Sequence, residues 1–235
     1  MSTVSKDTVI KAFTATIPVM TGYLVLAIGF GILLKTKGYG VGWSIAMSGF
    51  IYAGSMQYLA IDLLTGGASL ITTALTTFMV NARHLFYGIS MIDKYKDAGK
   101  KKPYLIFALT DETYSLVCSE ESVKGIDNSK EYYFLISLFN QSYWVAGSII
   151  GSLLGNIIPF NVEGIDFALT ALFVTIFVEQ WLSTKEHFPA LTGLFVSAMA
   201  LETRGADKFL IPSMVMIVVI LLLNRNKEGN KTDEN

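Results

Sequence analysis

The amino-acid sequence predicts an all-α, polytopic integral membrane protein. Of its 235 residues, 52% are hydrophobic and only 16% are charged, whereas a soluble domain carries about 25% charged residues. The hydrophobic residues are gathered in long blocks without charge, which is typical of membrane-spanning helices. We predict about seven transmembrane helices, in a range of six to eight. They form a single transmembrane domain over residues 12–224, between a polar N-terminus (1–11) and a polar C-terminal tail (225–235).

The first two uncharged runs each have the composition of a membrane segment. The first, Ala12 to Leu34, contains Pro18 and several glycines, and such residues kink or break transmembrane helices. It is therefore either one span or two half-helices that re-enter the membrane. The second run is Val41 to Ile61. If it forms one regular helix, Ser48 and Gln57 lie on different faces.

Gln57 lies among small residues at the membrane-embedded level of this second run. A buried amide needs a hydrogen-bond partner. That partner is either a ligand or another helix, and an interhelical hydrogen bond of this kind contributes about 1 kcal/mol.

The third run, which ends near Ile92, contains Asn81, Arg83 and His84. An arginine inside a spanning helix costs about 2.5–3.5 kcal/mol on insertion scales, so its position needs an explanation. On a regular helix Asn81 and His84 share one face, and Arg83 points to another. Either this helix has protein on both sides, or Arg83 lies near the membrane interface. In a third interpretation the stretch is a helix end that anchors to headgroups.

A lysine-rich loop and a pair of acids mark the next part of the chain. Five lysines lie between Asp93 and Pro103, and the positive-inside rule places this loop in the cytoplasm. The run Tyr104 to Ser119 then carries Asp111 and Glu112 at its middle. As neighbours on a helix, Asp111 and Glu112 project about 100° apart, so they cannot both point into one cavity. A carboxyl group held away from water exchanges its proton nearer neutral pH, so one acid is a candidate proton carrier and the other a partner for Arg83.

The remaining uncharged runs complete the predicted spans. They are Tyr132 to Val162, broken by Pro159, then Ile165 to Leu182, Phe188 to Leu201 and Phe209 to Asn224. Simple alternation of spans places the lysine loop and the basic N-terminus on opposite sides, which conflicts with the positive-inside rule. Either the first segment re-enters, or the segment with the paired acids or the segment from Phe188 does not span.

Glycines recur at helical spacing in the run from Tyr132. Gly147, Gly151 and Gly155 form G-x-x-x-G-x-x-x-G, a pattern that lets two helices approach closely in lipid. The pattern predicts tight packing, either within this chain or against a partner protein.

A weak internal repeat relates two parts of the sequence. Gly31 precedes Gln57 at nearly the same separation at which Gly155 precedes Gln180. Because transporter folds often contain internal repeats, we consider a repeat as one feature of the fold.

Several classes of function have no support in the sequence. The net charge of −1 gives no basic surface for nucleic acid. Neither a P-loop nor an H-E-x-x-H motif is present, and one cysteine with two separated histidines does not make a metal site. We therefore expect neither an enzyme nor a cofactor or metal. A membrane-embedded enzyme and a scaffold subunit are the alternatives, both disfavoured by the residues.

Four short segments resemble one protein family. The segments are Pro18 with Gly22-Tyr23, Tyr52-Ala53-Gly54 with Gln57, Asn81-Ala82-Arg83-His84, and Leu109-Thr110-Asp111-Glu112. In order and spacing they are similar to the AzlC-type large subunit of bacterial branched-chain amino acid exporters. The resemblance covers residues 12–182. It implies a multi-pass transporter in the bacterial plasma membrane that exports leucine, isoleucine and valine with a small AzlD-type membrane subunit. Export of another small amphipathic metabolite is the alternative.

The chemistry of the residues assigns roles within this resemblance. An amino acid needs a cation for its carboxylate, an acceptor for its ammonium group and an apolar pocket for its side chain. We expect proton coupling at Asp111 and Glu112. The expected substrate-binding residues are Tyr52, Gln57, Asn81, Arg83 and His84.

Overall fold

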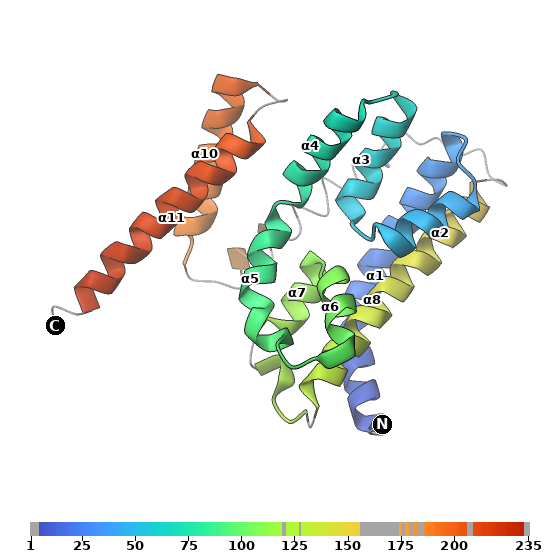
Figure 1. Cartoon of the computed structure of the whole chain (residues 1–235), viewed down its shortest axis with the longest axis horizontal. Coiled ribbons are helices and arrows are strands. Elements are labelled where there is room, and N and C mark those ends of the chain that lie inside the picture. The colour runs from blue at the N-terminus through green and yellow to red at the C-terminus, as the bar shows by residue number, and fades with distance from the viewer. Residues whose placement is uncertain are drawn as a thin grey trace. The chain divides into compact units, whose positions relative to one another are not determined.

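The computed structural model describes residues 5–118, 121–126, 128–155, 174, 177–178, 181–182, 186–205 and 209–232. Every regular element in these ranges is a helix. The chain divides into two compact units, Met1–Leu169 and Thr170–Asn235, which are described separately. The helices of unit 1 are α1 (Lys6–Thr36), α2 (Val41–Phe50), α3 (Gly54–Thr65), α4 (Leu70–Asn81), α5 (Arg83–Tyr95), the 3₁₀ turn η1 (Gly99–Lys101), α6 (Lys102–Phe107), α7 (Asp111–Val117), the 3₁₀ turn η2 (Glu121–Val123) and α8 (Ser129–Leu154) (Figure 1).

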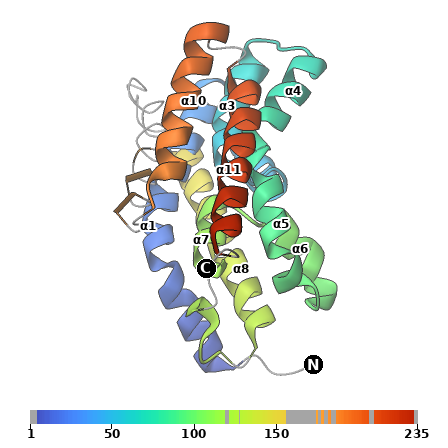
Figure 2. The same ribbon diagram turned by 90° about the vertical axis from the view of Figure 1, so that its left-hand side faces the viewer.

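Unit 2 contains α10 (Phe188–Arg204) and α11 (Leu210–Thr232), which lie side by side (Figure 2). Helix α11 continues into the polar tail that the sequence predicts from residue 225 onwards. Pro159, Gln180 and most of the predicted run from Ile165 lie outside the described residues. The second copy of the predicted internal repeat lies partly there as well, so that repeat remains a prediction.

Helix α1 and helix α8 form the frame of unit 1. They run side by side in the same direction, since Phe13 packs against Phe139 and Lys35 against Gly155. The glycines permit this contact: a Cβ atom at Gly151 would lie 2.1 Å from the backbone oxygen of Ile28. The G-x-x-x-G-x-x-x-G face therefore packs within this chain. Pro18 lies inside a continuous α1, so the alternative of a broken or re-entrant first segment is wrong.

The second predicted run reverses direction at its middle. Helix α2 begins just beyond the end of α1 and leads to Tyr52, which lies beside Tyr23. Helix α3 then returns along α1, where Tyr58 packs against Phe30 with ring centroids 5.8 Å apart. Tyr52 forms the turn with a φ of 45°, a left-handed conformation that is uncommon for a residue with a side chain. We call α2 and α3 with residues 51–53 the first hairpin.

The run with the paired acids also reverses. At its beginning Lys101 pairs with Glu131 of α8. At its end the Cys118 carbonyl accepts a hydrogen bond of 2.6 Å from Lys94, whose own carbonyl accepts one from Lys130 of α8. Both ends of the run therefore lie beside the start of α8, and residues 108–110 form the turn. We call α6 and α7 with this turn the second hairpin.

The first of these reversals resolves the charge conflict that simple alternation creates, because it lies between the N-terminus and the lysine-rich loop. The start of α1 lies at the same end of unit 1 as the lysine-rich loop, since Lys11 donates a hydrogen bond of 3.1 Å to the Gly125 carbonyl. We call this the basic end. The expected alternative in which the segment with Asp111 and Glu112 does not span agrees with its reversal in the structure, but this segment follows the lysine-rich loop and so does not bear on the conflict. The sequence did not predict the reversal of the second run.

The third predicted run forms two consecutive helices of unit 1, α4 and α5, with a break between them at Ala82 (Figure 1). We call these two helices the α4–α5 path. By length and composition, α1 is the one helix among the described residues that is long and apolar enough to cross a membrane. Leu70–Asn81 and Val215–Asn224 are shorter apolar helices. The number of membrane crossings therefore remains a prediction.

Candidate functional site

The turns of both hairpins and the break at Ala82 meet at one cavity of unit 1. Its volume is about 530 Å³, which lies in the usual range for small-molecule sites. Most lining residues are aliphatic or aromatic, and they come from the first turn, α4, α5 and the second hairpin. They are Ile51, Tyr52, Ala53, Thr77, Phe78, Asn81, Ala82, His84, Leu85, Gly88, Met91, Ile92, Tyr95, Lys102, Ile106, Phe107 and Leu109.

Helix α5 separates this cavity from helix α7. One of its faces, with His84, Gly88 and Tyr95, lines the cavity. The other face packs on α7, where the Tyr87 and Tyr114 rings stack with centroids 4.7 Å apart. The prediction that Asn81 and Arg83 point to different sides is therefore confirmed, and the helix has protein on both sides.

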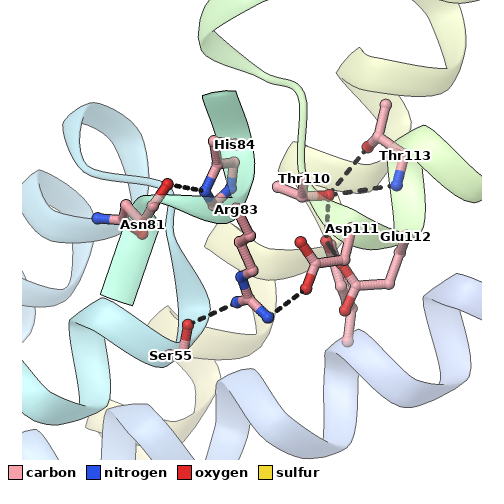
Figure 3. Close-up of polar contacts among 9 residues, drawn as sticks. Ser55, Asn81, Arg83, His84, Thr110, Asp111, Glu112 and Thr113 are labelled. Carbon is pink, nitrogen blue, oxygen red and sulfur yellow. Dashed lines mark hydrogen bonds and ion pairs between the residues drawn. The ribbon is translucent and has the colours of Figure 1, made fainter. Parts of the chain in front are cut away.

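Arg83 joins the first turns of three half-helices, α3, α5 and α7, in the described part of unit 1. One terminal nitrogen lies 2.6 Å from a carboxylate oxygen of Asp111. The other donates a hydrogen bond of 2.9 Å to the Ser55 hydroxyl (Figure 3). Arg83 is not among the residues that line the cavity. Its charge is therefore compensated inside the protein, as the ion-pair alternative predicts.

Glu112 points to a different set of partners from Asp111. Its carboxylate accepts a hydrogen bond of 2.7 Å from the Tyr23 hydroxyl of α1, and that hydroxyl lies 2.7 Å from Thr110 Oγ1. Thr110 also caps α7, because its side chain accepts a hydrogen bond from the Thr113 amide (Figure 3). The helix N-terminus stabilises negative charge on acids in the first turn. The expectation that Asp111 and Glu112 face different surroundings is confirmed.

A buried amide network adjoins this group. Gln57 is fully buried; it accepts a hydrogen bond of 2.9 Å from the Trp144 indole and donates one of 3.2 Å to Ser48. Ser48 and Gln57 thus lie together, and the prediction that they occupy different faces is wrong because the first hairpin reverses between them. Gln57 does not line the cavity, so its contacts match the interhelical alternative.

Two residues that line the cavity have a buried side-chain oxygen without a hydrogen-bond partner among the described residues. They are Asn81, at Oδ1, and Tyr95, at its hydroxyl. His84 lies beside Asn81, and its Nδ1 atom is 3.1 Å from the Asn81 carbonyl (Figure 3). Leaving such atoms unpaired costs about 1–3 kcal/mol each, so they favour a polar ligand in an otherwise apolar cavity.

The sequence interpretation missed several residues that the structure brings to this region. Tyr95 lies on the same face of α5 as His84, three helical turns later, and the 100° periodicity could have found it. Ser55, Thr110 and Lys102 belong to the two hairpins, and Tyr23 of α1 meets Thr110 at the second turn; local patterns did not indicate these contacts.

An arrangement of this kind suits a small amphipathic molecule. The first turn of α3 begins beside the cavity at residues 51–53, and its N-cap Ala53 gives no side-chain hydrogen bond. Uncapped amides at a helix N-terminus attract anionic groups. The Asn81 Oδ1 atom accepts hydrogen bonds, and the walls are apolar. A carboxylate, an ammonium group and a hydrocarbon side chain would each find a matching surface.

Comparisons with known proteins relate this chain to membrane and transport proteins. The sequence profile of the family described as AzlC protein matches residues 18–158. The branched-chain amino acid transport protein AzlC of Bacillus subtilis is 44% identical over 215 residues, which cover 92% of this chain and 84% of that protein. An uncharacterized membrane protein of Helicobacter pylori is 39% identical, with 92% and 94% covered. Inner membrane protein YgaZ of Escherichia coli is 26% identical, with 87% and 83% covered. No solved structure matches significantly.

The profile match includes Tyr52, Asn81, Arg83, His84 and both acids, and so contains the turns that build the cavity. The relatives are named as membrane or transport proteins and are similar along nearly the whole chain. The resemblance found in the sequence is thereby confirmed, and the chain belongs to the AzlC family.

Proposed function

We propose that this protein transports branched-chain amino acids through the cavity of unit 1. The observation that carries the proposal is that the turn at Tyr52, the break at Ala82 and the turn at Leu109 all line one cavity. Discontinuous helices at a central site are a recurring feature of secondary transporters. The relative from Bacillus subtilis, which is named a branched-chain amino acid transport protein, supports the choice of substrate.

The substrate-facing residues in this proposal are Tyr52, Asn81 and His84. The Asn81 Oδ1 atom accepts a hydrogen bond from the substrate ammonium group. The amides at the start of α3 hold the carboxylate, and Phe78 with its apolar neighbours contacts the side chain. Arg83 and Gln57 instead hold the half-helices in place, since their contacts are made within the protein.

We further propose that the protein exports its substrate from the cytoplasm in exchange for protons. The basic end of unit 1, with the lysine-rich loop, faces the cytoplasm by the positive-inside rule. In this arrangement α1, α8 and the α4–α5 path cross the bacterial plasma membrane, together with helices of unit 2. Glu112 carries the proton, and a small AzlD-type membrane subunit completes the transporter.

The test is export of leucine from cells that lack their own branched-chain exporters. Cells that express this protein with the small subunit are loaded with a leucine-containing dipeptide, and labelled leucine is followed in the medium. We expect faster efflux than from cells with an empty vector and resistance to toxic leucine analogues. Efflux at the empty-vector rate, with both subunits present in the membrane, would refute the proposal.

A pair of variants tests the cavity itself. Asn81→Leu keeps the side-chain size but removes the unpaired oxygen, and we expect most of the efflux to be lost. Thr73→Val is the matched control, because it also makes α4 less polar at a position that does not line the cavity. Equal efflux by both variants would exclude the cavity as the substrate path.

A further inference from the structure

The cavity extends along α5 away from the helix breaks and towards the basic end. Tyr95 and Lys102 line this far part, while Asn81 and His84 line the near part. His84 and Tyr95 are separated by eleven positions of one helix, which corresponds to roughly 16 Å at 1.5 Å per residue. One backbone unit of an amino acid spans roughly 3.5 Å. A single substrate molecule therefore cannot contact both ends at once.

Polar groups at the far end have no partner in the described part of the chain. The Tyr95 side chain is 2% exposed, and its hydroxyl makes no hydrogen bond there. The Lys102 ammonium group likewise makes no ion pair or hydrogen bond with a described residue. In contrast, Lys94 and Lys130 donate to backbone carbonyls, and Lys101 pairs with Glu131.

The surroundings of Tyr95 make solvation a poor explanation for its unpaired hydroxyl, whereas the Lys102 side chain is partly exposed. Met91 is 1% exposed and Leu105 is fully buried, and both belong to the core that also contains Tyr95. A buried hydroxyl group without a partner is destabilising. A hydroxyl donor and a lysine cation that line the same end of an apolar cavity match a carboxylate bonded to a short hydrocarbon.

We propose that Tyr95 and Lys102 form an entry site that binds the carboxylate of an amino acid before it reaches the helix breaks. This inference rests on the proposed transport function and adds a second binding position to it. The Lys102 ammonium group and the Tyr95 hydroxyl both donate to the carboxylate, and the substrate side chain lies against Met91 and Ile106. The site lies at the basic end, and so at the cytoplasmic mouth of the exporter.

Everted membrane vesicles test this proposal, because they expose the cytoplasmic face to a known concentration of substrate. Uptake of labelled leucine is measured against its concentration for the complete transporter. We expect Lys102→Gln to raise the KM about tenfold, in line with loss of one charged hydrogen bond, with little change in the maximal rate. Tyr95→Phe should raise the KM in the same way. Lys102→Arg keeps the charge and should retain most of the affinity.

Lys100→Gln is the matched control, since it removes the same charge two positions away and does not line the cavity. Leucinol, which has an alcohol in place of the carboxylate, gives a second readout. It should compete with leucine much less well in the unaltered protein, and this preference for leucine should shrink in Lys102→Gln.

The possible outcomes separate the two proposals. If the unaltered protein shows no leucine uptake, the transport function and the entry site both fall. If it transports leucine and Lys102→Gln matches Lys100→Gln in KM and in leucinol competition, the entry site alone is refuted. If the effect of Lys102→Gln is present only in vesicles that contain anionic lipid, Lys102 binds a lipid headgroup and the carboxylate proposal is also refuted.

Discussion

Removal of Arg83 should destabilise the protein, because it leaves Asp111 without its cation. The paired atoms are 2.6 Å apart, and the two side chains are only 28% and 17% exposed. Loss of one partner from a buried pair costs about 3–5 kcal/mol. Since both groups retain some contact with the surface, we take the lower end, about 3 kcal/mol for Arg83→Ala. For a chain of this size, that corresponds to a fall of about 6–12 °C in Tm.

A double-mutant cycle in detergent-purified protein separates pairing from the other contacts of these residues. Asp111→Asn should also lower the Tm, whereas the double variant should lose less than the sum of both changes. Exchange of the two charged residues, Arg83→Asp together with Asp111→Arg, should restore stability only in part, because a cation in the first turn of α7 opposes the helix dipole. Arg204→Ala is the control: its side chain is exposed on α10, and the Tm should hardly change.

The same variants distinguish a structural role from a binding role. If Arg83 binds substrate, Arg83→Ala should keep its Tm and lose export, and Arg83→Lys should fail as well because a point charge does not replace the two-pronged guanidinium. Normal Tm and normal export in well-expressed Arg83→Ala would contradict both roles. The reasoning from the ion pair would then be refuted, and Arg83 would be an interfacial anchor.

Further variants test coupling and packing. Glu112→Gln can still accept the hydrogen bond from Tyr23, so we expect it to fold and to exchange leucine across the membrane but to lose gradient-driven export; full pH-dependent export would exclude Glu112 as the proton carrier. Gly151→Ala should destabilise unit 1 by about 1–3 kcal/mol through overpacking, because its Cβ atom would lie 2.1 Å from the Ile28 oxygen. Gly22→Ala on α1 is the control, because a Cβ atom there would meet no atom within 4 Å. It should leave the Tm unchanged or raise it slightly. Equal Tm values for both glycine variants would contradict the packing argument.

Local patterns in the sequence predicted those parts of the site that keep a helical backbone. The separation of Asn81 from Arg83 follows from helical periodicity, and the structure retains it because Ala82, between α4 and α5, keeps helical dihedral angles (φ −56°, ψ −30°). The glycines of α8 also predicted close packing, since their spacing has a steric consequence whatever the partner is. The sequence could not identify that partner as α1.

The first hairpin was not predictable because its turn carries no local signal of reversal. The first turn is formed by Tyr52 with a positive φ, although glycine or asparagine usually marks such a position. Its run is uncharged throughout, so length and hydropathy both favour a straight span. A straight span also gives wrong side-chain neighbours, because Ser48 and Gln57 meet only when the chain reverses between them.

The contacts assign different tasks to the adjacent acids. Asp111 balances the charge of Arg83, so its protonation would leave that cation uncompensated among the first turns of α3, α5 and α7, where helix dipoles add further positive potential. Glu112 accepts a hydrogen bond from the neutral Tyr23 hydroxyl, which in turn lies beside the Thr110 hydroxyl. Its protonation removes no ion pair and leaves the Arg83 contacts intact. Of the two residues expected to couple protons, Glu112 can therefore change charge at the lower cost, while Asp111 keeps the half-helices together in both states.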